Sequence, residues 1–389
     1  MDKGTIIYIG GFELPDKNAA AHRVLNNGKI LKEIGYKVVF IDVDKELPYD
    51  YRIVNTRKEV QGFECWSLPY PKSNKQWINY LSNIDFFYEI INKYTNIKAV
   101  ICYNYQSMAF MKIKRYCAKN NIKIIADCTE WYNTKGANII FKIVKGFDSF
   151  LRMRIIQKRL DGLIVISRYL ENYYVKSKNV ICVPPLIDSS EKKWNIIDPS
   201  YEENKLRLVY AGSPGRNKDE LNILIESLYK LKQLSNYIFY VVGITEEQYL
   251  IDYREHREII ENLNDRIKFL GRLSHQESLK YVKMADFSVI IRRNSRTTKA
   301  GFSTKFVESM TCGTPVITTK TSDLEDYVIE GKNGFFINID DEKNTRSVLK
   351  KILEMNNKKI INMKRNCKQL KNFDYDTYIE KIKEFYDKL

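Results

Sequence analysis

The feature that most constrains the fold of this chain is a repeated alternation of short apolar segments with longer amphipathic ones. The short segments are almost continuously apolar, which is typical of strands covered on both faces of a parallel sheet. The segments between them, such as residues 19–34 and 106–119, have the periodicity of amphipathic helices. A first series of predicted strands covers residues 5–9, 37–42, 98–103, 123–127, 162–167 and 180–183.

The alternation stops at Val183-Pro184-Pro185 and restarts after a polar stretch that contains Pro199. Polar, proline-containing stretches of this kind are typical of linkers between domains. We therefore expect the α/β class, with two doubly wound, Rossmann-like parallel-sheet domains facing across a cleft. The predicted parts are a first domain at 1–187, a linker at 188–204, a second domain at 205–365 and a C-terminal helical segment at 366–389 that can pack back on the first domain. The second series of strands covers residues 206–212, 237–243, 267–270, 287–291, 315–319 and 334–337.

Composition narrows the class of protein only in part. The formal net charge of +16 favours anionic partners, which include nucleic acid, acidic lipid and phosphorylated substrates. The seven cysteines are scattered and form no C-x-x-C pair, so we expect free thiols in a reducing compartment. No apolar run approaches the roughly 18 residues of a membrane-spanning helix. These features predict a cytoplasmic protein, which can still lie on a membrane surface.

The most informative segment is residues 299–319, KAGFSTKFVESMTCGTPVITT. It predicts a turn, then a helix capped by Ser303 or Thr304, a left-handed C-cap at Gly313, and a strand opened by Pro315. The helix N-terminus should point its backbone N–H groups at the cleft, an arrangement that binds phosphate. The predicted anion-binding amides are those of Gly301, Phe302, Ser303 and Thr304.

Two side chains on this helix extend the predicted site. Lys305 places a cation beside the amides, and Glu308 follows one turn later. A carboxylate at that position can accept hydrogen bonds from two neighbouring ribose hydroxyls. The alternative is an ordinary capped surface helix with a solvated glutamate.

Three further loops follow predicted strands. In YAGSPGRNKD, residues 210–219, Arg216 and Lys218 can clamp a diphosphate beside a helix N-terminus. In the loop after the first strand, Gly10 and Gly11 allow close approach of backbone to a ligand, although G-x-G-x-x-G is absent. Each loop can equally be an ordinary strand–helix turn.

The third loop is ADCTEWY, residues 126–132. Asp127 and Glu130 lie at a strand end, where either could orient a sugar hydroxyl or accept a proton. Trp131 offers an apolar face for a sugar ring. The alternative is a helix cap followed by a core aromatic residue.

A metal site is not predicted. Asp42-Val43-Asp44 is a D-x-D pattern, but no partner cluster accompanies it. The three histidines, His22, His256 and His275, are far apart in sequence, whereas a zinc site needs clustered ligands. The chain also lacks a Walker A loop and a G-x-S-x-G motif.

Residues 135–160 form a basic, amphipathic segment. Seven Lys and Arg accompany one Asp, and the apolar residues fall roughly on one helical face. Such a segment can lie on an anionic membrane surface, or it can pack its apolar stripe on its own sheet. The apolar positions are Ile140, Ile143, Val144, Phe147, Leu151 and Ile155.

Taken together, these motifs resemble those of family 4 glycosyltransferases of the GT-B fold, of the bacterial surface-polysaccharide type. The strongest likeness is GFSTKFVESMTCGTPVI, the counterpart of the donor-site signature of that family. YAGSPGRNKDELNILIESL, GRLSHQESLKYVKMADFSVI, VPPLID and TSDLEDYV followed by GKNGFF support it, in that family's order and spacing. The resemblance covers nearly the whole chain.

The resemblance implies roles for several residues. Glu308 would bind the donor ribose, and Arg216 and Lys218 would hold the diphosphate with the amides of residues 301–304. Gly10 and Gly11 would lie against the donor phosphates from the other domain. It also implies a retaining, metal-independent reaction without a cofactor.

Two departures from the family pattern concern the sugar and the acid–base group. Ala300 stands where the family often has a second glutamate that helps to hold the donor sugar. The ADCTEWY loop lacks the usual histidine, so that Asp127 or Glu130 would replace it.

We therefore expect transfer of a hexosyl or related group from a UDP- or GDP-linked sugar to a glycan or lipid-linked acceptor. The setting would be capsule, O-antigen or exopolysaccharide biosynthesis, in the cytoplasm or on the inner face of the plasma membrane. One alternative is a nucleotide-sugar epimerase of the same fold, which Ala300 disfavours. The other is a basic nucleic-acid binder, but no zinc finger or RNA-recognition motif is present.

Overall fold

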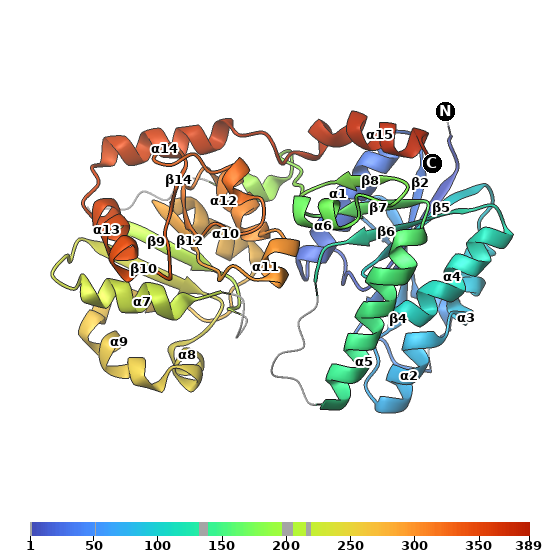
Figure 1. Cartoon of the computed structure of the whole chain (residues 1–389), viewed down its shortest axis with the longest axis horizontal. Helices are drawn as coiled ribbons and strands as arrows, with labels where there is room; N and C mark the ends of the chain where they lie inside the picture. The colour runs from blue at the N-terminus through green and yellow to red at the C-terminus, as the bar shows by residue number, and fades with distance from the viewer. Residues whose placement is uncertain (1, 51, 132–138, 197–204, 215–218) are drawn as a thin grey trace. The chain divides into compact units, whose positions relative to one another are not determined.

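The computed structural model describes residues 2–50, 52–131, 139–196, 205–214 and 219–389, with backbone only at 139–141. The chain divides into two compact units. Unit 1 comprises Met1–Asp188, Ala300–Phe302 and Asp374–Leu389, and unit 2 comprises Ser189–Lys299 and Ser303–Phe373. Each unit is built on its own sheet with helices around it (Figure 1).

Unit 1 contains an eight-stranded sheet in the order β3-β4-β2-β1-β5-β6-β7-β8. All neighbouring pairs are parallel except β3 and β4, which form an antiparallel pair at one edge. The strands are β1 (Thr5–Ile9), β2 (Lys37–Asp44), β3 (Arg57–Val60), β4 (Phe63–Pro69), β5 (Ile97–Tyr103), β6 (Lys123–Cys128), β7 (Gly162–Val165) and β8 (Val180–Cys182).

The helices of unit 1 connect these strands, and the last of them comes from the end of the chain. They are α1 (Ala19–Glu33), α2 (Asn74–Ser82), α3 (Asp85–Ile91), α4 (Ser107–Lys119), α5 (Ile139–Phe150), α6 (Arg168–Tyr173) and α15 (Ile379–Asp387). A π-helical segment, Leu151–Ile156, continues directly from α5. α15 packs on α1 and buries Ile382, Phe385 and Tyr386 in the same apolar core as Tyr8 and Phe40.

Unit 2 contains a six-stranded, wholly parallel sheet in the order β11-β10-β9-β12-β13-β14. Its strands are β9 (Leu206–Ala211), β10 (Tyr237–Val242), β11 (Ile267–Phe269), β12 (Phe287–Ile290), β13 (Val316–Thr318) and β14 (Gly334–Phe336). Its helices are α7 (Leu221–Lys230), α8 (Glu246–Asp252), α9 (Arg257–Leu263), α10 (His275–Met284), α11 (Arg296–Ala300, whose last residue is grouped with unit 1), α12 (Thr304–Cys312), α13 (Glu342–Leu353) and α14 (Asn357–Gln369).

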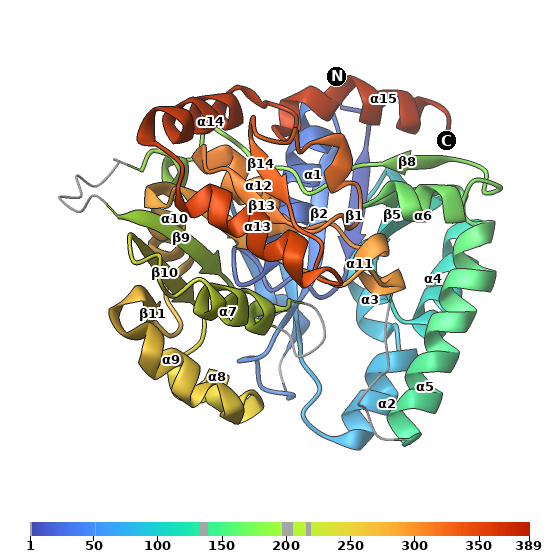
Figure 2. The same cartoon turned by 60° about the vertical axis from the view of Figure 1, so that its left-hand side comes forward.

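Both faces of the unit 2 sheet are covered, and the strand residues alternate between the two cores. Leu208 and Tyr210 of β9 pack in a cluster that includes residues of α7 and α13, whereas Val209 packs in a second cluster with residues of α10. Because successive side chains on a strand point to opposite faces, a strand buried on both sides must be apolar throughout. This explains why β10 is apolar throughout and why Arg207 is the one charged residue of β9. Figure 2 shows the strands of this sheet with the helices around them.

The predicted α/β class with two parallel-sheet domains is confirmed. One strand pair is missing from the prediction. β3, with the sequence RKEV, exposes three of its four residues at the sheet edge and carries no buried apolar run. Of the predicted linker, residues 197–204 lie outside the described residues.

All seven cysteines are free thiols; Cys182 is half-buried and the others are buried. Burial raises the pKa of the Cys65 thiol to about 12, so this thiol stays protonated at neutral pH. None of the helices in the described ranges combines the length and the apolar character needed to cross a membrane.

Candidate functional site

The helix α12 begins and ends where the sequence predicts. Ser303 is its N-cap residue, and Gly313 ends it in the left-handed region with φ of +73°. The Ser303 side chain is 97% buried but does not cap the helix, and its hydroxyl has no hydrogen-bond partner among the described residues. A buried hydroxyl at a helix N-terminus is suited to an anionic ligand, because the helix dipole and the N–H groups favour negative charge there.

Lys305, in the first turn of α12, is held in place by two groups. Its Nζ lies 2.6 Å from Asp219 Oδ2 and 2.7 Å from the Tyr210 hydroxyl. The side chain keeps 19% of its surface exposed. The lysine is therefore a positioned cation at the helix N-terminus and not a freely moving surface charge.

Asp219 organises this part of unit 2, although the sequence analysis did not single it out. Its Oδ1 accepts a hydrogen bond from Arg292 Nε at 2.7 Å, and its side chain is only 4% exposed. Burial alone would raise the pKa of Asp219, but the charges of Arg292 and Lys305 outweigh it and hold the pKa well below the ordinary value. Two cations around one carboxylate leave the group with net positive charge. Its position at the end of the 210–219 loop, just before α7, is the signal that could have identified it.

Glu308 lies one turn further along α12 and is paired with a histidine. His275 Nε2, at the start of α10, is 3.0 Å from Glu308 Oε1, and the two side chains are 28% and 18% exposed. An ionised carboxylate can only accept hydrogen bonds, so Nε2 carries the proton in this contact. The sequence identified Glu308, whereas it gave His275 no role.

Glycines follow the carboxyl ends of β9 and β10 and allow the two loops there to approach each other closely. A Cβ on Gly212 would lie 2.4 Å from Lys305 Cε, and one on Gly243 would lie 2.2 Å from the Gly212 carbonyl oxygen. Both have positive φ, +143° and +120°. Glycine is therefore required at Gly212 by its backbone conformation, and at Gly243 by backbone conformation and by space.

In unit 1, the loop that carries Gly10 and Gly11 is fixed by Asp42. The Asp42 carboxylate is buried and accepts hydrogen bonds from the backbone N–H groups of Phe12, Glu13 and Leu14. The first aspartate of the D-x-D pattern thus shapes the loop that follows β1. Gly10 also packs tightly, since a Cβ there would lie 2.7 Å from the Phe12 ring.

Asp127 lies in the interior of unit 1, where the sequence analysis expected an accessible acid–base group. It is fully buried and pairs with Arg23, whose Nη2 lies 2.8 Å from Oδ1. The Tyr8 hydroxyl also donates to Asp127, and Arg23 Nη1 donates to the carbonyl of Val183 at 2.8 Å. A carboxylate engaged in this way holds β6, α1 and the end of β8 together. Its position therefore favours a structural role over the predicted catalytic one.

Glu130 differs from Asp127, because it is exposed after the end of β6. Next to it, Trp131 is half-buried and packs edge-on against Tyr173, with ring centroids 5.0 Å apart. Of the two predicted carboxylates in this loop, Glu130 is the one that a substrate can reach.

Four other residues were predicted to bind the phosphates, two in the 210–219 loop and two just before α12. Arg216 and Lys218 lie outside the described residues. Gly301 and Phe302 precede α12 directly but are grouped with unit 1, whereas Ser303 and Thr304 belong to unit 2. Within unit 2, the structure brings Lys305 and Glu308 of α12 together with Tyr210, Asp219 and His275.

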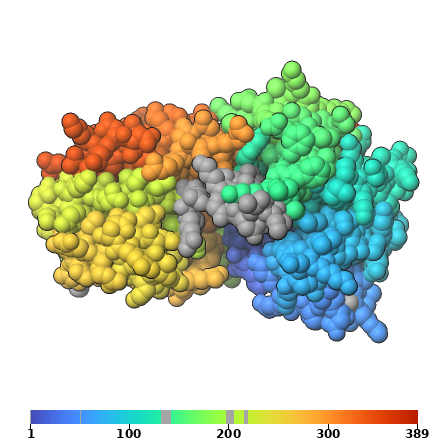
Figure 3. Space-filling model, turned by 60° about the horizontal axis from the view of Figure 1, so that its bottom comes forward, coloured from blue at the N-terminus to red at the C-terminus, as the bar shows by residue number. Residues whose placement is uncertain are grey.

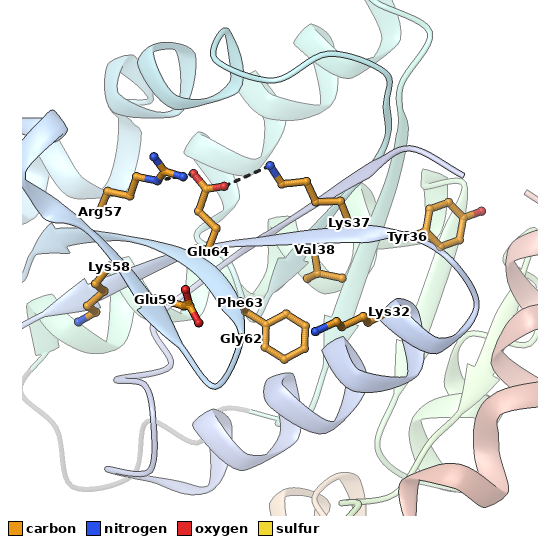
Figure 4. Close-up of a pocket in the computed structure, with 10 residues that line it drawn as sticks. All are labelled: Lys32, Tyr36, Lys37, Val38, Arg57, Lys58, Glu59, Gly62, Phe63 and Glu64. Atoms are coloured by element: carbon orange, nitrogen blue, oxygen red, sulfur yellow. Dashed lines mark ion pairs between the residues drawn. The ribbon is translucent and has the colours of Figure 1, made fainter. Parts of the chain in front are cut away.

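A separate pocket of 670 Å³ lies in unit 1 (Figure 4). Lys37 and Val38, the first residues of β2, line it together with Arg57 and Glu64, and both cations pair with that glutamate. It therefore lies at the amino end of β2, whereas ligands of open α/β sheets bind beyond the carboxyl ends. None of the predicted site residues in the described part of the chain lines it.

The residues of α12 described above lie in a segment that matches a known protein family. Residues 193–370 match the family model of glycosyl transferases group 1. The uncharacterized glycosyltransferase MJ1069 of Methanocaldococcus jannaschii is 23% identical over 248 residues, which cover 61% of this chain and 60% of that protein. Its counterpart MJ1178 from the same organism is 31% identical over 135 residues, 34% of this chain and 36% of that protein.

Solved structures are similar over almost the whole chain. Sucrose-phosphate synthase from Thermosynechococcus elongatus has a TM-score of 0.72 at 17% identity, covering 99% of this chain and 98% of that one. Anabaena HepE in complex with UDP and glucose has a TM-score of 0.67 at 13% identity, covering 99% and 100%. This chain is therefore a two-domain α/β protein of the GT-B fold, whose residues 193–370 match the group 1 glycosyl transferases.

Proposed function

We propose that this protein is a glycosyltransferase that moves a sugar from a nucleoside diphosphate sugar to a glycan or lipid-linked acceptor. The observation that carries the proposal is the arrangement on α12, where the helix N-terminus, Lys305 and Glu308 follow one another within two turns. These groups match the parts of the donor in order, with positive charge for the pyrophosphate and a carboxylate for the ribose. They lie within the segment that matches the group 1 model.

The pyrophosphate would bind at the N-terminus of α12. There the Ser303 hydroxyl, the backbone amides of residues 301–304 and Lys305 can donate hydrogen bonds to its oxygens. Asp219 keeps Lys305 extended toward Tyr210 and so fixes the position of its charge. Arg216 and Lys218 are proposed as a second pair of cations, and Gly10 and Gly11 as a close backbone approach from the loop after β1.

The ribose would bind at Glu308. His275 holds one carboxylate oxygen, Oε1, and thereby orients the other, Oε2, for the ribose hydroxyls.

The reaction would break the bond between the anomeric carbon and the diphosphate oxygen. Positive charge then develops on the sugar ring, and the bonding electron pair leaves with the diphosphate. Lys305 and the helix N-terminus stabilise the negative charge that grows on that leaving group. The acceptor hydroxyl forms the new bond to the anomeric carbon and loses its proton, for which Glu130 is the candidate acceptor. We propose a retaining, metal-independent reaction, as the family resemblance implies.

The donor and the setting are also proposals. HepE has been solved with UDP and with UDP-glucose, which supports a UDP-linked hexose over a GDP-linked one. A lipid-linked acceptor in the assembly of a surface polysaccharide would place the enzyme in the cytoplasm, at the inner face of the membrane. The basic segment at residues 135–160 supports this setting.

Ligand-dependent thermal unfolding of the full chain tests the proposal. A nucleotide at 100 times its dissociation constant stabilises a protein by about 2.7 kcal/mol, so the correct base should stand out among UDP, GDP and ADP. Incubation with the matching nucleotide sugar should then release the nucleoside diphosphate slowly. Appearance of a new nucleotide sugar instead would identify an epimerase. If no nucleotide raises the melting temperature and no nucleotide sugar is consumed, the proposal is wrong.

A further inference from the structure

The helix α5 of unit 1 presents its apolar side chains to solvent. Ile143, Phe147 and Phe150 are spaced by four and three residues, so they share one face, and they are 66%, 62% and 48% exposed. Val144, beside them, is 50% exposed. The segment, in the green of the colour bar, lies at the surface of the space-filling view (Figure 3).

The face of α5 that packs on unit 1 is polar, whereas the π-helical segment that follows it also buries Met153 and Ile156. Asp148 accepts a hydrogen bond from the Ser107 backbone N–H at 2.7 Å, and Arg152 donates to the Asn104 carbonyl at 3.0 Å. Arg152 is only 1% exposed. A helix that packs its apolar stripe on its own sheet would have the opposite polarity. Unit 1 therefore does not use the apolar stripe of α5 as core.

Within residues 142–160, every exposed charged side chain is positive. Lys142, Arg154, Lys158 and Arg159 are exposed, while Asp148, the one acidic residue between 139 and 160, is buried. Arg154 lies over the Phe150 ring at 5.4 Å from its centroid, so cation and apolar surface are contiguous. Exposed apolar side chains that alternate with exposed Lys and Arg along one segment are complementary to a bilayer surface with anionic headgroups.

We propose that the exposed face of α5 docks unit 1 on an anionic lipid bilayer, with Ile143, Val144, Phe147 and Phe150 inserted between the headgroups. The flanking cations contact the lipid phosphates, as in other helices that lie in the plane of an interface. Docking of this kind requires neither donor nor acceptor, so it stands independently of the proposed reaction. It gives a physical reason for an apolar surface that the fold leaves uncovered.

Vesicle flotation with the full chain is the primary test. The protein should float with vesicles of equimolar phosphatidylcholine and phosphatidylglycerol, but not with phosphatidylcholine alone, and added salt should weaken the binding. F147S/F150S should lower the partition coefficient by at least about tenfold, because two exposed aromatic side chains no longer insert. K142Q/R154Q should lower it roughly tenfold in low salt.

Matched variants in unit 2 serve as controls. I251S/I361S removes equally exposed apolar side chains from α8 and α14, and K358Q/K359Q removes two exposed cations from α14. Both should bind vesicles as the wild type does. Because every substituted side chain is exposed, all variants should keep the wild-type melting temperature.

A reporter at the centre of the face locates the contact. Phe147→Trp should show a blue-shifted emission on vesicles, and lipids brominated along the acyl chain should quench it. Vesicle binding without quenching would assign the contact to another surface and overturn the proposal. So would equal binding by F147S/F150S and wild type, or a loss of self-association in that variant without any lipid binding, which would identify a second copy as the occupant.

Discussion

In unit 2, the buried carboxylate of Asp219 forms ion pairs with two cations, Arg292 and Lys305. We predict that Asp219→Asn lowers the free energy of unfolding by about 3 kcal/mol, because Arg292 and Lys305 lose their counter-charge. Chemical denaturation measures the difference. Asp340→Asn is the control, since Asp340 is 83% exposed and 3.8 Å from Arg293, and it should change stability by less than about 0.5 kcal/mol.

The Asp219 carboxylate also makes the folding stability depend on pH, and its depressed pKa determines the direction of that dependence. Its folded-state pKa is depressed, so its contribution is complete above its unfolded pKa of about 4 and is lost only as pH falls below that value. The stability difference between wild type and Asp219→Asn should therefore be constant from about pH 5 to pH 8 and shrink in more acidic solution. A difference that already varies near neutral pH would contradict this assignment.

The Glu308–His275 contact predicts an effect on donor binding with little effect on folding. Glu308→Gln should weaken nucleoside diphosphate binding about tenfold to a hundredfold, because a charged acceptor for the ribose is lost. His275→Ala should have a smaller effect in the same direction, and His275→Gln should partly restore affinity by donating to Glu308. Calorimetric titration compares them, with Glu354→Gln on the exposed end of α13 as the control. Unchanged affinity in Glu308→Gln would remove the ribose assignment.

At the scale of elements, the loops after β9 and β10 approach each other only because both begin with glycine. Gly243→Ala would bring a Cβ into the Gly212 carbonyl and force a side chain into positive φ. We predict a loss of more than about 1 kcal/mol in stability, together with weaker nucleotide binding because Gly212 adjoins Lys305. Thermal unfolding with and without nucleotide measures both effects.

At a second glycine we predict that substitution by alanine has the opposite effect on stability. Gly146 lies inside α5, and a Cβ there would meet nothing within 4 Å. Gly146→Ala should therefore stabilise the helix by about 0.5–1 kcal/mol, because alanine loses less backbone entropy on folding. Circular dichroism during thermal unfolding tests this. Destabilisation would mean that the exposed side of α5 is covered in solution.

At the scale of the whole molecule, the C-terminal helix α15 completes the apolar core of unit 1, which the N-terminal part of the chain begins. Phe385 of α15 is 5% exposed, and its ring would lie 2.6 Å from a Cβ on Gly162 of β7. We predict that Phe385→Ala lowers the stability of unit 1 by about 3–5 kcal/mol, through the loss of buried surface and the cavity left behind. Ile361→Ala on α14, where the side chain is 48% exposed, should change little. Limited proteolysis of Phe385→Ala, with and without nucleotide, would show whether unit 1 unfolds before unit 2, as expected.

The parts of this molecule that the sequence predicted depend on interactions between residues close together in the chain. The strands of both sheets other than β3 and β4, and the start and end of α12, follow from apolar runs, the N-cap at Ser303 and the left-handed Gly313, all of which act within a few residues. Glu308 could be identified because it shares a helix with the anion-binding terminus. The RKEV edge strand could not, because only its pairing with β4 makes it a strand.

The tertiary structure alone decided the pairings between distant residues. Asp219 meets Arg292 and Lys305 across 73 and 86 residues, and Asp127 meets Arg23 across 104. Strand order determines which loops become neighbours, and no local pattern encodes that order. The sequence also showed that α5 has an apolar stripe and left both orientations open. Only packing showed that Ile143, Val144 and Phe147 of this stripe face solvent. The buried contacts of Asp148 and Arg152 turn polar side chains of the segment inward.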